Sequence, residues 1–292
     1  MPLTSYPLFP MEATLPSTLA DFPTLSAAPA PLLQLQRTLA SDTLKLKRTA
    51  ALRLTLLSGA FPVLITFLIF FFKGDIIMKA GGSAWPRFIN ASWQTAGTLL
   101  LPLFVVLLTS LVVNIETKAT AWKHLYAQPV GRGAVFLSKL LLILALNAVA
   151  LLLFVGLLLG AGMLLSVLKP KLGFALSTIP FDTVVWMLLR TYVATLGLLA
   201  VQYVVSLFWR SFVVPVGVGM GAVVATIALL SWEHVDKIPY AAPLGTAMAM
   251  KMGKGTLTVA HELAKHEWYS LGWFAGVLVL GYLVLLRRNV TN

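Results

Sequence analysis

Six stretches of the chain are almost purely apolar, and the connections between them hold most of the charged side chains. Each stretch reaches roughly the 20 residues that an α-helix needs to cross the hydrocarbon core of a bilayer. The predicted spans are Leu54 to Phe72, Ala96 to Val113, Leu140 to Leu165, Val184 to Leu207, Phe212 to Leu230, and Tyr269 to Leu286. The pattern predicts an all-α, polytopic membrane protein with six transmembrane helices.

The segment before the first span divides into two parts. Residues 1–32 hold seven prolines among Ser, Thr and Ala and no Lys or Arg, which predicts a disordered tail rather than a secretory signal. From residue 33 onward, leucines mix with basic residues, among them Lys45, Lys47 and Arg48. This mixture predicts an amphipathic interfacial helix that leads into the first span. A basic flank that only anchors the span is the alternative.

Composition narrows the class of protein. Hydrophobic residues make up 59% of the 292 residues and charged residues only 11%, against about a quarter in soluble domains. The net charge of +12 would indicate nucleic acid in a soluble chain, but in a membrane chain it favours the cytoplasmic headgroups. We therefore expect the lipid bilayer and no nucleic acid as a partner. The absence of cysteine excludes disulfides and thiolate metal sites.

The distribution of Lys and Arg predicts the orientation. An even number of spans places both termini on one side of the membrane. With the termini inside, twelve Lys and Arg side chains lie in cytoplasmic segments and nine in outer ones. We expect a protein of the cytoplasmic (inner) membrane with both termini cytoplasmic.

Within the spans, a few residues stand out. Pro62, Pro102 and Pro215 indicate helices packed in a bundle, where neighbours can satisfy the freed carbonyls. Gly217 and Gly221 have the GxxxG spacing that lets two helices approach closely, either within the chain or across a dimer. Arg190 is the only ionisable side chain inside a predicted span. We interpret it as snorkelling to the outer headgroups, with contact to an anionic substrate as the alternative.

Two segments resemble catalytic motifs but do not match them. The outer segment HELAKH places His261 and His266 five residues apart, whereas a zinc-binding helix needs four. We interpret it instead as an amphipathic helix with Glu262, Lys265 and Glu267 on its solvated side. The string around Gly253 lacks the first glycine of a phosphate-binding loop. We therefore predict no catalytic residue, no cofactor and no metal.

The connection between the second and third spans combines aromatic, aliphatic and basic groups. Trp122 and Leu125 lie at helical spacing beside Lys123, and a break follows at Pro129 to Gly133. Such a short helix suits docking into a groove of a partner protein. An interfacial belt of aromatic residues would explain Trp122 alone.

The same connection resembles the cytoplasmic loop of type 2 ABC transporter permeases. The matching residues are Glu116, Thr120, Trp122, Lys123, Leu125, Pro129, Arg132 and Lys139. The segment around Lys45, Lys47 and Arg48 is similar to the entry of the lantibiotic and bacitracin self-protection subgroup.

The resemblance implies that residues 33–292 form a six-helix permease domain without its own ATPase. Two permease chains, identical or not, would share separate ATP-binding subunits. The loop would be a coupling helix that rests on such a subunit, with Glu116, Trp122, Lys123, Leu125, Pro129 and Arg132 as its coupling residues. We therefore expect the permease of an ATP-driven exporter; a membrane-embedded enzyme or an assembly factor without transport activity is the alternative.

Overall fold

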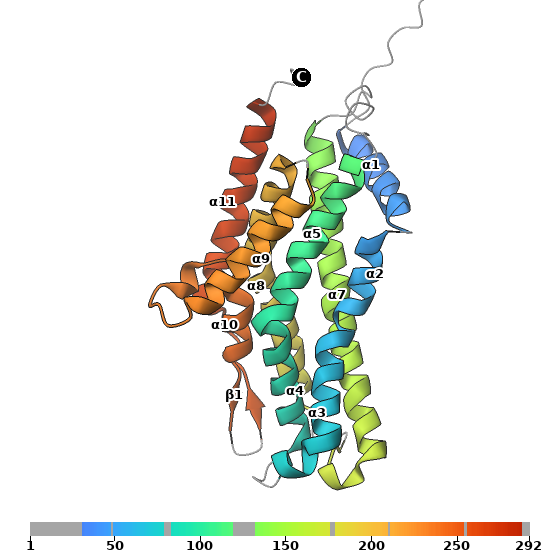
Figure 1. The fold of residues 1–292 in the computed structure, drawn as a ribbon, viewed down its shortest axis with the longest axis vertical. Helices are drawn as coiled ribbons and strands as arrows, with labels where there is room; N and C mark the ends of the chain where they lie inside the picture. The colour runs from blue at the N-terminus through green and yellow to red at the C-terminus, as the bar shows by residue number, and fades with distance from the viewer. Residues whose placement is uncertain are drawn as a thin grey trace, which may run out of the picture.

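Long helices run side by side along most of the molecule and give it an elongated shape (Figure 1). The computed structural model describes residues 31–47, 49–78, 83–118, 132–175, 179–209, 211–253 and 256–287. The α-helices are α1 (Pro31–Leu46), α2 (Ala50–Ser58), α3 (Ala60–Met78), α4 (Ala84–Thr95), α5 (Leu101–Lys118), α7 (Arg132–Leu168), α8 (Phe181–Phe208), α9 (Val213–Ala228), α10 (Ala242–Met248) and α11 (Lys265–Arg287).

Shorter elements join these helices. The π-helix η2 (Ala96–Leu100) links α4 to α5, and the 3-10 turns η3 (Pro170–Leu172) and η5 (Val235–Lys237) lie in connections. Strands β1 (Lys251–Met252) and β2 (Leu257–Thr258) form an antiparallel hairpin in which Lys251 lies opposite Thr258.

Five helical stretches of the described chain are long and apolar enough to cross a membrane. They are Ala50–Met78, Ala84–Ile115, Gly133–Leu168, Phe181–Phe208 and Lys265–Arg287. The predicted all-α, multi-pass architecture is therefore confirmed. The apolar stretch predicted as the fifth span forms α9, whose 16 residues cover about 24 Å, less than the roughly 30 Å of a hydrocarbon core. The sixth crossing stays a prediction.

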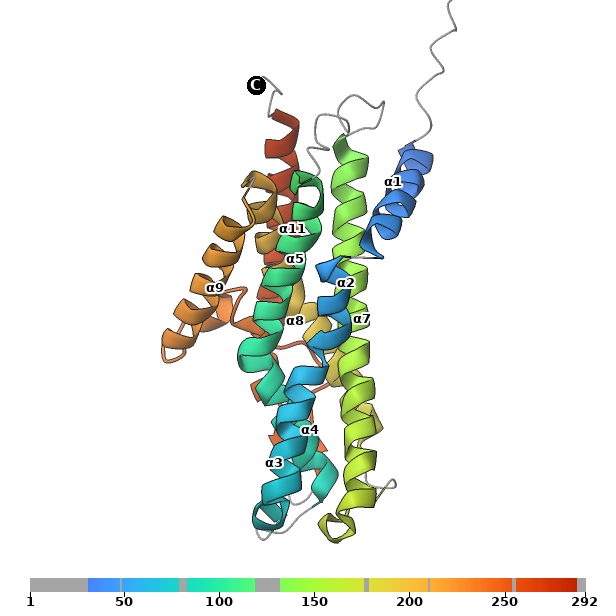
Figure 2. The same ribbon diagram turned by 45° about the vertical axis from the view of Figure 1, so that its right-hand side comes forward.

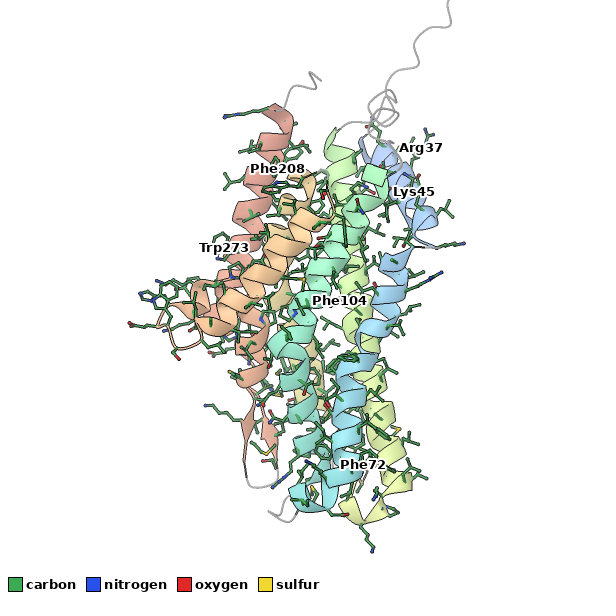
Figure 3. The ribbon with its side chains drawn as sticks, in the orientation of Figure 1. Arg37, Lys45, Phe72, Phe104, Phe208 and Trp273 are labelled. Atoms are coloured by element: carbon green, nitrogen blue, oxygen red, sulfur yellow. The ribbon has the colours of Figure 1, made fainter. Side chains whose placement is uncertain are left out.

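The two ends of the bundle differ. In both ribbon views α1, the end of α5, the start of α7 and the end of α11 lie at one end (Figures 1 and 2). The end of α3, the start of α4 and the β hairpin lie toward the other end (Figure 1). Arg37 and Lys45 mark the first end, whereas Phe72 lies near the second (Figure 3). The first and last described helices and the two helices that flank residues 119–131 therefore end on one side (Figures 1 and 2). The placement of both termini in the cytoplasm stays a prediction.

The described residues form two apolar clusters in the interior of the bundle. One joins α5, α7 and α8 through residues such as Leu108, Ile143 and Leu199. The other contains several aromatic residues among aliphatic ones, and in it Phe70 meets Phe88 edge to face at 5.2 Å between ring centroids. Many other large apolar side chains, such as Phe72 and Val167, remain exposed, as expected for a surface that faces lipid.

Candidate functional site

The predicted coupling residues lie where α5 ends and α7 begins. Helix α5 continues to Lys118 and α7 starts at Arg132, so Glu116 and Arg132 belong to these two helices. Trp122, Lys123, Leu125 and Pro129 lie outside the described residues. Their role as coupling residues stays a prediction.

The helix predicted to lie on the membrane surface is anchored to the start of α7. Asp42 of α1 is buried and accepts a hydrogen bond of 2.7 Å from the hydroxyl of Ser138. The same carboxylate lies 4.0 Å from the ammonium of Lys139, which is also buried, and 3.7 Å from that of Lys45. A buried carboxylate is retained only when it is paired and hydrogen-bonded in this way. Helix α1 is therefore fixed to the first turns of α7.

The basic residues predicted for this helix take different places. Lys45 lies in its last turn and Lys47 directly follows it, whereas Arg48 lies outside the described residues. Leu33 and Leu44 are exposed, and their separation of eleven residues places them on the same side of the helix. Contact of this side with the membrane surface remains a prediction.

Two neighbouring spans lose backbone hydrogen bonds at the same cavity, although both remain helical there. Pro62 has no N–H to bond the carbonyl of Ser58, and α2 ends at Ser58. Pro102 likewise cannot bond the carbonyl of Thr98, which lies in η2. π-Helical turns of this kind are frequent at functional sites.

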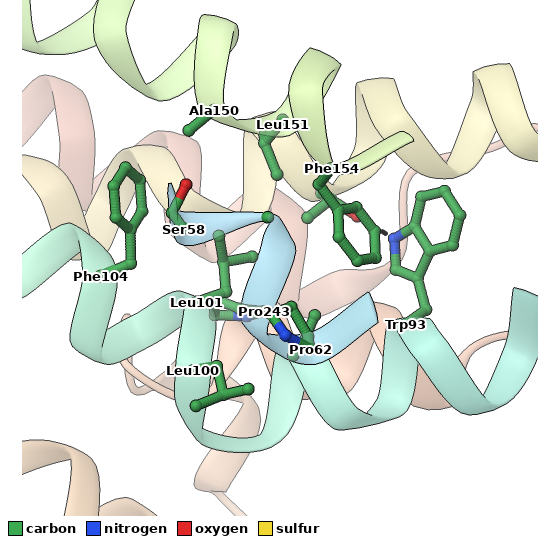
Figure 4. A pocket seen from close by; sticks show the side chains of 14 residues that line it. Ser58, Pro62, Trp93, Leu100, Leu101, Phe104, Ala150, Leu151, Phe154 and Pro243 are labelled. Carbon is green, nitrogen blue, oxygen red and sulfur yellow. Dashed lines mark hydrogen bonds between the residues drawn. The ribbon is translucent and has the colours of Figure 1, made fainter. Parts of the chain in front are cut away.

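These segments line a small cavity of about 30 Å³. Its walls come from α2, α3, α4, η2, α5, α7, α8 and α10, and its lining residues are Ser58, Gly59, Pro62, Trp93, Ala96, Gly97, Leu100, Leu101, Phe104, Ala150, Leu151, Phe154, Thr191 and Pro243. Figure 4 shows Phe104 at one end, and Trp93 and Phe154 together at the other. All of these side chains are uncharged, so the cavity suits an apolar group.

Two close contacts shape this cavity. The indole N–H of Trp93 donates to the hydroxyl of Thr191 at 3.0 Å, and its ring meets Phe154 edge to face at 5.2 Å. Gly59 allows the first span to touch α7, because a Cβ there would lie 2.7 Å from the Cα of Phe154. Any larger residue at position 59 would push these two spans apart.

A buried ion pair joins α8 to α11. The guanidinium Nε of Arg190 lies 2.9 Å and 3.1 Å from the two carboxylate oxygens of Glu267, and both side chains are at most 2% exposed. Arg190 also donates to the carbonyl of Ala260, at 3.0 Å. The carboxylate accepts two further hydrogen bonds of 2.8 Å, from the hydroxyl of Thr246 and the backbone N–H of Ala264.

This pair overturns two interpretations made from the sequence. Arg190 does not snorkel to the headgroups, because its charge is neutralised by Glu267 inside the protein. Glu267 does not lie on a solvated face, because α11 turns it toward α8. The sequence signal that was missed is that a buried arginine needs a buried acid as its partner. Glu267, near the start of the last span, was one of the acids available for that role.

The two histidines of HELAKH have different surroundings. Helix α11 begins only at Lys265, so the predicted helix is wrong for residues 261–264, where His261 lies, and right from Lys265 onward. His261 is exposed, pairs with Asp182 at 3.0 Å and stacks on Trp186. His266 is buried and lies 3.1 Å from the hydroxyl of Thr246.

A polar network holds α9 against the bundle. The buried amide of Gln202 donates to the carbonyl of Pro215 at 2.8 Å and to the hydroxyl of Ser110 at 3.2 Å. Its oxygen accepts from the hydroxyl of Tyr240 at 3.1 Å. Burial raises the pKa of Tyr240 to about 12, so this hydroxyl stays protonated and can donate.

The glycines of α9 fall on two sides. A Cβ at Gly219 would lie 2.5 Å from Val106, so this glycine sits in the contact with α5. A Cβ at Gly217 or Gly221 would meet nothing within 4 Å. The predicted close approach at Gly217 and Gly221 is therefore not made within the chain, and a contact with a second chain stays a prediction.

The five helices of the described chain that are long and apolar enough to cross a bilayer define a multi-pass membrane protein. A family model of ABC-2 family transporter proteins matches residues 38–228, about two thirds of the chain. The chain therefore belongs to the ABC-2 transporter family, as a membrane subunit and not itself an enzyme. A search of curated proteins finds no match.

Proposed function

We propose that this chain is the permease subunit of an ATP-driven exporter in the cytoplasmic membrane. A separate ABC-type ATP-binding subunit supplies the energy, and a second permease chain completes the pathway. The family match supports a transporter subunit of this kind. Membership of the lantibiotic and bacitracin subgroup is part of the proposal and rests on the resemblance of the sequence alone.

The observation that carries the proposal is the junction of α1, α5 and α7 at one end of the bundle. Residues 119–131 connect α5 to α7 there, and Asp42 ties α1 to the first turns of α7 through Ser138 and Lys139. A push on the connection is therefore transmitted to α1 and α7 together. That is what a docking point for an ATP-binding subunit requires.

The cavity offers a place where such a push could act on a substrate. It lies where α2 meets α3 and where η2 interrupts the second span. Helices interrupted in this way bend more easily than continuous ones, because fewer backbone hydrogen bonds resist the motion. At about 30 Å³ the cavity is too small for a substrate in this conformation, so the spans must move apart to admit one. Its largely apolar lining, with the hydroxyls of Ser58 and Thr191, then suits an amphipathic or lipid-like molecule.

Purification from the native membrane tests the proposal. We expect the tagged chain to bring down an ABC-type ATP-binding subunit, and ATP hydrolysis to require that subunit. Reconstituted vesicles with both proteins should then move substrate only with ATP. Robust ATP hydrolysis by the chain alone, after removal of contaminants, would contradict the proposal.

A further inference from the structure

The short helix α10 forms one wall of the cavity. Pro243 of α10 lies among the lining residues, and α10 packs there against η2. A Cβ at Gly97 would lie 2.7 Å from the Cβ of Ala247 and 2.9 Å from the carbonyl oxygen of Pro243. Helix α10 is therefore pressed against the π-helical turn, with glycine at the point of contact.

The other side of α10 faces the buried ion pair. Thr246 donates its hydroxyl proton to Glu267 at 2.8 Å, and the same oxygen lies 3.1 Å from Nε2 of His266. Because a hydroxyl has a single proton, Thr246 accepts the second hydrogen bond from an Nε2–H of His266. Gly245 makes room for this arrangement, since a Cβ there would lie 3.1 Å from the imidazole.

Helix α10 cannot hold its position on its own. It has seven residues, and isolated helices of that length are not stable in water. Its neighbours therefore fix it: η2 on one side, and α8 and α11 through Arg190, Glu267 and Thr246 on the other. Of these, the hydrogen bond from Thr246 is the link between α10 and the ion pair.

We propose that α10 is a movable wall of the cavity and that Arg190 and Glu267 are positioning residues that hold it closed through Thr246. When α8 and α11 shift, Thr246 loses its acceptor and α10 moves away from Gly97. The cavity then opens on the side that α10 closes. This inference rests on the proposed transport function, for which it supplies the release step.

A single cysteine can report this opening, because the chain contains none. Ser58→Cys changes one atom of a lining residue and places a thiol in the wall of the cavity. The purified full chain in lipid nanodiscs is treated with a charged, membrane-impermeant maleimide, and the rate of labelling is measured. In the otherwise unaltered chain, this thiol should react slowly with the maleimide.

Thr246→Val keeps the shape of the side chain and removes the hydroxyl. Since a hydrogen bond to a charged group shifts an equilibrium by about tenfold or more, we expect labelling of Ser58→Cys to accelerate by that factor. Glu267→Gln should act in the same direction. The matched control is Thr226→Val, whose buried hydroxyl bonds only within α9, to the carbonyl of Ala222, and which should leave the rate unchanged.

A second variant adds a methyl group between η2 and α10 and leaves Thr246 and Glu267 unaltered. Gly97→Ala places a methyl group against Ala247 and should also accelerate labelling by displacing α10. Equal labelling rates in Thr246→Val, Gly97→Ala and the Thr226→Val control, in protein that elutes as a single folded species, would overturn the movable wall.

The ATP-binding subunit separates the inference from the proposed function. With that subunit and ATP, labelling of Ser58→Cys in the otherwise unaltered chain should accelerate. If Thr246→Val accelerates labelling but ATP does not, the wall moves as inferred and its part in ATP-driven transport is refuted. If neither does, the inference itself is refuted.

Discussion

Arg190 of α8 and Glu267 of α11 lie 2.9 Å apart although 77 residues separate them in the chain. Both side chains are buried, and each also binds a group of the segment between α9 and α11, Ala260 for the arginine and Thr246 for the carboxylate. The pair therefore joins two spans and the segment between them. Removing two charges from water costs desolvation free energy, and the attraction between the charges and their further hydrogen bonds offset that cost.

Removal of one partner should destabilise the protein strongly. Glu267→Gln leaves the guanidinium of Arg190 buried without its counter-charge, which typically costs about 3–5 kcal/mol. The double variant Arg190→Met/Glu267→Leu removes both charges and should lose less than the single variant. Thermal unfolding in detergent, followed by tryptophan fluorescence, measures the difference. Glu233→Gln, at an exposed glutamate after α9, is the control.

A double variant that loses as much stability as Glu267→Gln, or more, would contradict this view of the pair. The effect of removing one charge would then not depend on the presence of the other.

Ser138→Ala should loosen α1. The change deletes the hydrogen bond to the Asp42 carboxylate, which is worth about 1.5–3 kcal/mol as a bond to a charged group. Hydrogen exchange of the amides of α1 should then accelerate, while exchange in α8 stays constant. Ser166→Ala is a matched control in the same helix, since its exposed hydroxyl bonds only to Met163. Unchanged exchange in α1 would show that Asp42 does not anchor it.

The glycines of α9 separate packing within the chain from packing between chains. Gly219→Ala inserts a methyl group against Val106 and Gln202 and should cost about 1–3 kcal/mol through overpacking. Gly217→Leu and Gly221→Leu meet open space and should leave the single chain equally stable. If this side of α9 contacts a second chain, these two variants should instead weaken the dimer, measured by crosslinking in membranes.

A dimer that survives both leucine variants would remove Gly217 and Gly221 from the interface.

Reporter fusions test the orientation and the sixth crossing. A reporter after Asn292 should be active only in the cytoplasm, and one at Lys251 only outside. A third reporter, at Lys237, decides whether α9 crosses the membrane: outside activity is expected if it does. Cytoplasmic activity at Lys237 would mean that the 16 residues of α9 turn back, and the six-span prediction would be wrong.

Local sequence was enough to predict the long helices, because apolar stretches of 20 residues leave few other structures in a membrane. It also marked Pro62 and Pro102, whose missing N–H groups account for the breaks in the first two spans. That both breaks lie at one cavity could not be predicted, because it depends on the relative heights of spans that the sequence does not encode locally.

The long-range polar contacts could not be predicted from the sequence. Arg190 was recognised as unusual, but the acid that neutralises it lies in a segment whose HELAKH motif suggested a solvated helix. Asp42 gave no signal at all, since a single acid in a basic, amphipathic segment is ordinarily a surface residue. Its burial follows from the packing of α1 on α7, where Ser138 and Lys139 meet it.

The proposed function requires that the connection between α5 and α7 couple the permease to an ATP-binding subunit. The most direct measurement is ATP turnover by that subunit reconstituted with the chain carrying Trp122→Ala/Leu125→Ala. A few buried anchors usually carry most of the affinity of an interface, so binding and stimulation of turnover should fall about tenfold or more. Glu116→Gln should have a smaller effect in the same direction, because a single surface ion pair with a partner is typically worth under about 1 kcal/mol.

The matched control is Leu230→Ala/Trp232→Ala, which removes the same two side-chain types from the exposed connection after α9. It should leave binding and turnover unchanged. We expect the Trp122/Leu125 variant to insert and fold normally while losing stimulation of ATP turnover; normal turnover and normal binding of the ATP-binding subunit by that variant would contradict the coupling role of the connection.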